Sequence, residues 1–263
     1  MVQQDENELM IDVKNIKTHE TYALPSKGLV YKPEENIPAS ITLRRMTTKE
    51  DKIRMRNLSE DKIRRDLLQA CITTEGVDAG KLKLVDANLL LFRLRSLSLL
   101  NDKYKVTCVC PTCGTEFIHE VNLSEVPVEY LSDDILDKMS IKLPISQNTI
   151  QLKYPSINDT IKMSDNLIDY FNQFPNADRS ETLYTLGALL YIDTVDNRKL
   201  LSEEKEAYLD NLDIIDSRVL QNAISHLDNL YGFTETLKTR CPKCNREVEH
   251  GLPITRELFN PSN

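Results

Sequence analysis

Two cysteine motifs of identical spacing, CPTC at residues 110–113 and CPKC at residues 241–244, constrain this chain more than any other feature. A structural zinc ion prefers four soft ligands in a tetrahedron, and a C-x-x-C turn offers two thiolates from one tight loop. Two such turns complete the coordination shell, so the motifs predict one structural Zn²⁺ per chain. The predicted ligands are Cys110, Cys113, Cys241 and Cys244.

The residues around each motif favour a β-hairpin. Apolar and polar residues alternate on both sides of the first motif, near Val106 and near Val121, which is typical of strands. The second motif has similar surroundings, with Asn245 where the first has Gly114, and both residue types tolerate a left-handed backbone. We therefore expect two knuckles, meaning hairpins tipped by a C-P-x-C turn, that face each other across one metal.

Other uses of the cysteines fit less well. No apolar run is long enough to cross a bilayer, and the first residues are acidic and polar, so we expect synthesis in the cytoplasm. Thiols stay reduced there, which argues against disulfides between the motifs. A catalytic zinc keeps an open coordination position, which four thiolates would fill. His119 and His250 follow the knuckles and are expected outside the ligand set. Cys108 is expected to be a bystander, and Cys71 to lie on the buried face of a helix.

The net charge of −8 argues against a general nucleic-acid binder, which would offer a basic face to phosphates. A zinc-ribbon nucleic-acid-binding or transcription-associated factor nevertheless stays as the alternative. Its best support is a group of basic residues around the second knuckle, Lys238, Arg240, Lys243 and Arg246.

A second internal repeat lies upstream of the knuckles. ITLRRMTTKEDKIRM starts at Ile41 and IQLKYPSINDTIKM at Ile150, and LPSKG and LPISQ precede them. Each unit reads as a short strand, a capping Thr or Ser, an acidic residue three positions on, and a helix. This pattern predicts two related halves, each ending in a knuckle, although two ordinary strand-to-helix junctions could match by coincidence.

The expected fold is therefore α+β, mainly helical, with two related halves joined by a discontinuous zinc ribbon. Helices are expected to open at Ser59, Asp86 and Ser180. A last helix is expected within DSRVLQNAISHLDNLYG, and Gly232 is expected to end it. The expected segments are an N-terminal arm at 1–21, a first half at 22–105, a ribbon at 106–125 with 235–256, a second half at 126–234 and a C-terminal tail at 257–263.

The sequence carries no recognisable catalytic motif. It has no phosphate-binding glycine loop, no G-x-S-x-G and no H-E-x-x-H, and no motif surrounds its four histidines. We therefore expect a protein that acts by binding and not as an enzyme.

The order of several stretches resembles a known family. ALPSKGLVY, ITLRRMTTKEDKI, the helix and first cysteine pair in DANLLLFRLRSLSLLNDKYKVTCVCPTCG, and LPITRELFNPS are similar to the baseplate hub and hub assembly proteins of T-even-type contractile-tailed bacteriophages. Relatives often carry a double Phe near the end, where this chain has Leu258 and Phe259.

The resemblance implies a non-enzymatic structural or assembly component of the hub region of a contractile tail baseplate. The implied partners are other hub and tail proteins, with the tape-measure protein as a further candidate, in a symmetric assembly of several copies. Synthesis in the host cytoplasm and a place in the virion tail baseplate follow, and neither nucleic acid nor membrane is an expected partner.

Overall fold

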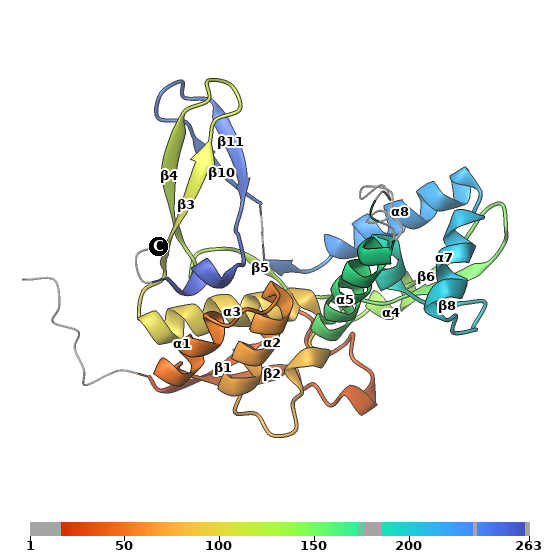
Figure 1. Ribbon diagram of the computed structural model, residues 1–263, viewed down its shortest axis with the longest axis horizontal. Helices are drawn as coiled ribbons and strands as arrows, with labels where there is room; N and C mark the ends of the chain where they lie inside the picture. Colours follow the sequence, from red (N-terminus) through yellow and green to blue (C-terminus); the bar gives the residue numbers. More distant parts are fainter. Residues whose placement is uncertain (1–16, 174, 176–185, 234–235, 261–263) are drawn as a thin grey trace, which may run out of the picture.

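The computed structural model describes residues 17–173, 175, 186–233 and 236–260 (Figure 1). Helices and small antiparallel sheets both occur, which confirms the α+β class. The described strands form four two-stranded sheets and one three-stranded sheet. The expected N-terminal arm and the helix start at Ser180 fall largely or wholly outside the described residues.

The first part of the chain holds a hairpin, three helices and a knuckle hairpin. These elements are β1 (His19–Ala23), β2 (Ser40–Arg44), α1 (Thr48–Arg54), α2 (Glu60–Cys71), α3 (Leu84–Leu99), β3 (Lys103–Val109), β4 (Glu116–Asn122) and β5 (Val128–Glu129), with short 3₁₀ helices at Pro33–Glu35 and Ala79–Lys81. β1 includes residues 19–21, which the sequence assigned to the arm. None of its residues is fully buried, so it carries no core pattern that sequence analysis could detect.

Within the described residues, the second part has a similar order of elements with one additional helix and one additional strand. These elements are α4 (Ile135–Lys138), β6 (Ser140–Lys142), β7 (Thr149–Leu152), α5 (Ile157–Gln173), β8 (Ile192–Val195), α7 (Ser202–Asp210), α8 (Ile214–Asp228), β9 (Gly232–Phe233), β10 (Thr236–Arg240), β11 (Glu247–Gly251) and a 3₁₀ helix at Arg256–Phe259.

The first hydrophobic core surrounds α3, which is buried along most of its length. The end of the described chain also packs there. Leu258 is fully buried and Phe259 nearly so, and the Leu258 carbonyl accepts a 2.7 Å hydrogen bond from Nε of Arg95 on α3. The expectation of a C-terminal tail is therefore wrong for these residues, because an apolar pair anchors them in the core. A second core lies between β6–β8 and α8.

The hairpins β1–β2 and β6–β7 share one geometry. Tyr22 pairs with Ile41 in the first, and Ile141 pairs with Ile150 in the second. In both, a leucine that follows the first strand donates its N–H to the carbonyl of the residue just before the second strand. These bonds are Leu24 to Ala39 at 2.8 Å and Leu143 to Asn148 at 2.9 Å.

Both hairpins lead into a helix with the same reciprocal cap. Thr47 donates its N–H and its hydroxyl to one carboxylate oxygen of Glu50, at 2.8 and 2.7 Å. Ser156 makes the same two bonds to Asp159, at 2.9 and 2.8 Å. The capping-box spacing in the sequence therefore corresponds to caps in the structure.

A buried aspartate in α3 holds the Leu-Pro loop of the first part. Asp86 is the third residue of α3, which begins at Leu84, so the expected start at Asp86 is wrong. Its carboxylate accepts the Ser26 N–H at 3.0 Å and the Tyr31 hydroxyl at 2.7 Å. Asp86 thus anchors a distant loop instead of capping its own helix.

The second part repeats this contact. α8 begins at Ile214 after the capping residue Asp213, so Asp216 is again the third helical residue. Its carboxylate accepts the N–H groups of Ile145 and Ser146, both at 2.8 Å. The two loops follow Leu24-Pro25 and Leu143-Pro144, so the same anchor occurs at matching positions.

The two parts meet where α3 begins. The Leu84 N–H donates to the Pro155 carbonyl at 3.1 Å, and the Ile157 N–H donates to the Leu82 carbonyl at 3.0 Å. Ile157 is fully buried and belongs to the first core. The junction between β7 and α5 is therefore inserted into the first part.

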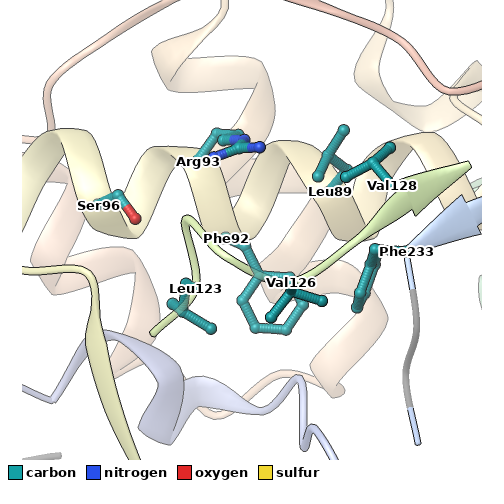
Figure 2. A pocket seen from close by; sticks show the side chains of 8 residues that line it. All are labelled: Leu89, Phe92, Arg93, Ser96, Leu123, Val126, Val128 and Phe233. Atoms are coloured by element: carbon teal, nitrogen blue, oxygen red, sulfur yellow. The ribbon is translucent and has the colours of Figure 1, made fainter. Parts of the chain in front are cut away.

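The short strands β5 and β9 also bind the second part to α3 (Figure 2). The rings of Phe92 and Phe233 meet edge to face at 4.9 Å between centroids. Beside them lies a cavity of about 10 Å³, lined mainly by apolar side chains. Such a volume holds about one water molecule, so this contact is a packing interface and not a small-molecule site.

Candidate metal centre

The first C-P-x-C turn continues the ladder of β3 and β4 to its tip. The Cys110 N–H donates to the Thr115 carbonyl, and the Gly114 N–H donates to the Cys110 carbonyl, both at 2.9 Å. Gly114 has φ +67°, a left-handed conformation that glycine adopts without strain. This backbone turns both cysteine side chains of the knuckle toward one point.

The second turn has the same backbone. The Cys241 N–H donates to the Arg246 carbonyl, and the Asn245 N–H donates to the Cys241 carbonyl, both at 2.9 Å. Asn245 has φ +57° in the place of Gly114, as the sequence predicts. In Figure 1 the hairpins β3–β4 and β10–β11 rise side by side with their turns at the same end.

The structure brings all four motif cysteines together. Their sulfur atoms lie within 4.8 Å of one another, with Cys110 to Cys244 at 3.6 Å and Cys113 to Cys241 at 3.7 Å. These separations are too long for disulfides. Four sulfurs at about 2.3 Å from a central zinc would be about 3.8 Å apart, so the cluster has tetrahedral dimensions.

The surroundings of the sulfurs differ in how strongly they favour the thiolate that a metal requires. Against the effect of the Arg246 N–H, burial and the neighbouring cysteines raise the pKa of Cys244 to about 11. The Thr115 hydroxyl lies 3.2 Å from the Cys113 sulfur. The hydroxyl and the Thr115 N–H both favour the thiolate, and they lower the pKa of Cys113 to about 6. A lower pKa allows metal to bind near neutral pH with less competition from protons.

The two remaining cysteines lie away from this cluster. Cys71 is fully buried in α2, as expected for a core position. Cys108 is buried in β3 within the first core, and its thiol lies 3.7 Å from the Val106 carbonyl. Neither belongs to the group that could hold a metal.

A contact between two histidines was not expected from the sequence. Nδ1 of His119 on β4 and Nε2 of His250 on β11 are 2.7 Å apart. The expectation that both lie outside the ligand set agrees with the cysteine cluster, but only the structure shows that they join the hairpins. Burial and the neighbouring His250 lower the pKa of His119.

The basic group around the second knuckle is partly neutralised. Nζ of Lys238 lies 3.2 Å from the Glu247 carboxylate and 3.1 Å from that of Glu249. This local pairing reduces the positive potential that a phosphate backbone would meet.

A cleft of about 440 Å³ lies between the two parts of the chain. Four lysines line it, and three of them form an ion pair with an acidic side chain of the same cleft. The pairs are Lys32–Asp193 at 3.1 Å, Lys83–Glu35 at 2.8 Å and Lys153–Asp159 at 2.8 Å. The pairing of these charges fits a structural role between the parts better than a catalytic one.

A comparison with protein families identifies the chain. The model of the family described as T4 bacteriophage base plate protein matches residues 16–260. The chain belongs to this base plate family. The match includes both knuckles and both Leu-Pro loops, and it confirms the resemblance at the level of the baseplate. The chain matches none of the curated proteins and none of the solved structures with which it was compared.

Membership in the base plate family supports a structural component of a phage baseplate, and with it a location in the virion tail and contacts with other baseplate proteins. Within the described ranges, no helix has both the length and the apolar character that a bilayer crossing requires. The four clustered cysteines are compatible with a bound metal ion.

Proposed function

We propose that this chain is a non-enzymatic component or assembly factor of the hub region of the baseplate, built around one structural zinc. The clustering of four sulfurs from two distant hairpins carries the proposal, because a thiolate shell leaves no open position for a substrate. The partners are other hub and tail proteins, with the tape-measure protein as a further candidate.

In this proposal the zinc pins together two related halves. The first hairpin follows α3 and the second follows α8, so the metal joins the end of one half to the end of the other. The matching Leu-Pro loops, caps and buried aspartates support the relationship. A rigid, metal-pinned scaffold suits a part with a fixed place in a larger assembly.

The zinc site is tested by the metal content of the purified full chain. Cys110→Ser and Cys241→Ser are compared with wild type and with Cys108→Ser, whose sulfur lies outside the cluster. We expect one zinc per chain in wild type and in Cys108→Ser, and loss of zinc in both other variants. Two zincs per wild-type chain, or loss confined to one knuckle, would contradict the shared site.

The hub location is tested by gold labelling of a tagged chain in tails and in assembly intermediates. Label at the centre of the baseplate supports the proposal, whereas label only at the periphery contradicts the hub role and leaves the family assignment intact. Binding to DNA that weakens steeply with salt, without label on the tail, would favour the nucleic-acid alternative.

A further inference from the structure

The contact between the two parts provides a template for a second contact of the same kind. On one side lies the segment that leads into α3, where Leu82 and Leu84 pair with the backbone of residues 155–157. On the other side lies the junction between β7 and α5. A Cβ on Gly80 would meet the side chain of Asn158, so these two residues are in direct contact.

The segment that leads into α8 resembles the segment that leads into α3, but it is exposed to solvent. The Leu212 N–H donates to the Leu209 carbonyl at 3.1 Å, as the Leu82 N–H donates to the Ala79 carbonyl at 3.2 Å. Leu212 thus corresponds to Leu82. By the same offset Ile214 corresponds to Leu84, and Asp210 to Gly80.

Three exposed isoleucines lie around the start of α8. Ile145, Ile214 and Ile215 are 54%, 64% and 51% exposed, although apolar side chains of this size are usually buried. They gather around the start of α8, because the Ile145 N–H binds Asp216 two residues after Ile214. Together with Asp210 they form the α8 surface.

The junction between β7 and α5, the other side of the template contact, corresponds to an exposed junction between β2 and α1. The two capped junctions align without a gap, so Met46, Thr47 and Thr48 correspond to Pro155, Ser156 and Ile157. Thr47, Thr48 and Lys49 are exposed, and Met46 is partly exposed. Residues 46–49 form the α1 surface. Figure 1 shows α1 and α7 toward opposite ends of the molecule, with α5 between them.

The charges of the two surfaces are complementary. Lys49 occupies the place of Asn158, and Asp210 occupies the place of Gly80. A second copy docked in the template geometry would therefore set Lys49 against Asp210. Lys52 and Asp213, both exposed, add a further positive charge to one side and a negative charge to the other.

We propose that this chain associates head to tail with a second copy of itself, the α1 surface of one copy docking on the α8 surface of the next. The contact repeats the one between the two parts of each chain. Because its two surfaces differ, it is heterologous and forms a ring if the rotation closes, or an open filament otherwise.

The intermolecular contact is weaker than its template. Ile157 is inserted into the first core, whereas the corresponding residue of the α1 surface is the polar Thr48. In the contact between two copies, the partner covers the exposed isoleucines. It contributes fewer apolar side chains than the β7–α5 junction contributes to the contact within one chain. Association therefore depends on high local concentration, as a larger assembly provides.

Sedimentation of the full chain over a series of concentrations tests the proposal. We expect the average mass of wild type to rise with concentration. Lys49→Glu and Asp210→Lys should each weaken association at least about tenfold, equivalent to about 1.4 kcal/mol. The double variant, with both charges exchanged, should recover it. Lys162→Glu makes the same charge change on an exposed position of α5 and should have no effect.

A mixing experiment tests the direction of the contact. Ile214→Glu changes only the α8 surface, and an acidic residue in the first turn of a helix is favourable, so folding should be preserved. Lys49→Glu changes only the α1 surface. Each variant alone should stay monomeric, and an equimolar mixture should form dimers that grow no further, since one intact surface of each kind remains.

Several results would overturn head-to-tail association. Wild type that stays monomeric at every concentration is one, and association that survives both Ile214→Glu and Lys49→Glu is another. Failure of the exchanged charges to restore association would show that Lys49 and Asp210 do not meet. None of these outcomes bears on the zinc site or on the hub location.

Discussion

Asp86, the third residue of α3, accepts the backbone N–H of Ser26, and Asp216, the third residue of α8, accepts that of Ile145. Ser26 and Ile145 each lie two residues after the leucine that follows the first strand of a hairpin. In both cases the carboxylate lies in the interior and supports a loop far away in the sequence. The aspartates thus fix how each loop packs on its helix.

Removal of the Asp86 carboxylate should destabilise the fold. Asp86→Ala leaves the Ser26 N–H and the Tyr31 hydroxyl without their acceptor in a buried place. Unsatisfied buried groups of this kind lower the free energy of unfolding by about 2–4 kcal/mol in total. Asp86→Asn keeps one acceptor oxygen and should lose less. Urea unfolding of the three proteins measures this order, and equal losses would contradict it.

Removal of metal should loosen the hairpins before the helical core. Structural zinc contributes on the order of 10 kcal/mol of apparent binding energy in small domains. With a strong chelator, we expect faster amide hydrogen exchange in β3, β4, β10 and β11 and a lower Tm, while α3 stays protected. Unchanged exchange in the hairpins would show that no metal supports them. Cys113→Ser should reproduce the effect without chelator.

The ion pair at the first capped junction should make stability depend on acid pH. The Arg44 side chain, 2.9 Å away, lowers the pKa of Glu50 from 4.5 to about 2, together with hydrogen bonds from Thr47 and against the effect of burial. A carboxyl with a lowered pKa in the fold contributes stability above its unfolded pKa, and this contribution is lost as pH falls from 4.5 to about 2.

Glu50→Gln isolates this contribution from other acid effects. The difference in free energy of unfolding between wild type and Glu50→Gln should be constant above pH 4.5 and shrink as pH falls toward 2. Urea unfolding at a series of pH values measures it. Two parallel curves across this range would mean that Glu50 does not titrate as the ion pair requires.

Replacement of glycine by alanine should have opposite effects on stability at Gly232 and at Gly187. Gly232 has φ +122°, and a Cβ there would meet Cγ1 of Val85 at 2.6 Å, so Gly232→Ala strains both the backbone and the packing on α3. Gly187 lies in a helical stretch with open space around it. Gly187→Ala should raise stability by up to about 1 kcal/mol. Thermal unfolding compares them, and a shared sign would contradict the packing.

The anchored end of the chain gives a further contrast. Leu258 is fully buried against α3, whereas Met55 is 71% exposed. Leu258→Ala should lower the free energy of unfolding by about 2–5 kcal/mol through lost burial and a cavity, and Met55→Ala should change it little. Similar small losses in both variants would mean that residues 256–259 do not belong to the core.

The elements that sequence analysis found best are those set by local chemistry. The C-P-x-C turns, the caps at Thr47 and Ser156 and the apolar helix α3 each depend on residues only a few positions apart. The misplaced start at Asp86 has the opposite cause. An acidic residue near a helix start fits a local capping role, but this one binds the distant residues Ser26 and Tyr31.

The sequence by itself determined which residues could bind a metal, where the two capped helices begin and that two stretches repeat, because turn geometry and side-chain periodicity act over short range. Only the tertiary structure decided that the four sulfurs meet, that Leu258 is buried and that the start of α3 is covered while the start of α8 is open. These depend on which surfaces pack together, and burial is a property of the whole chain.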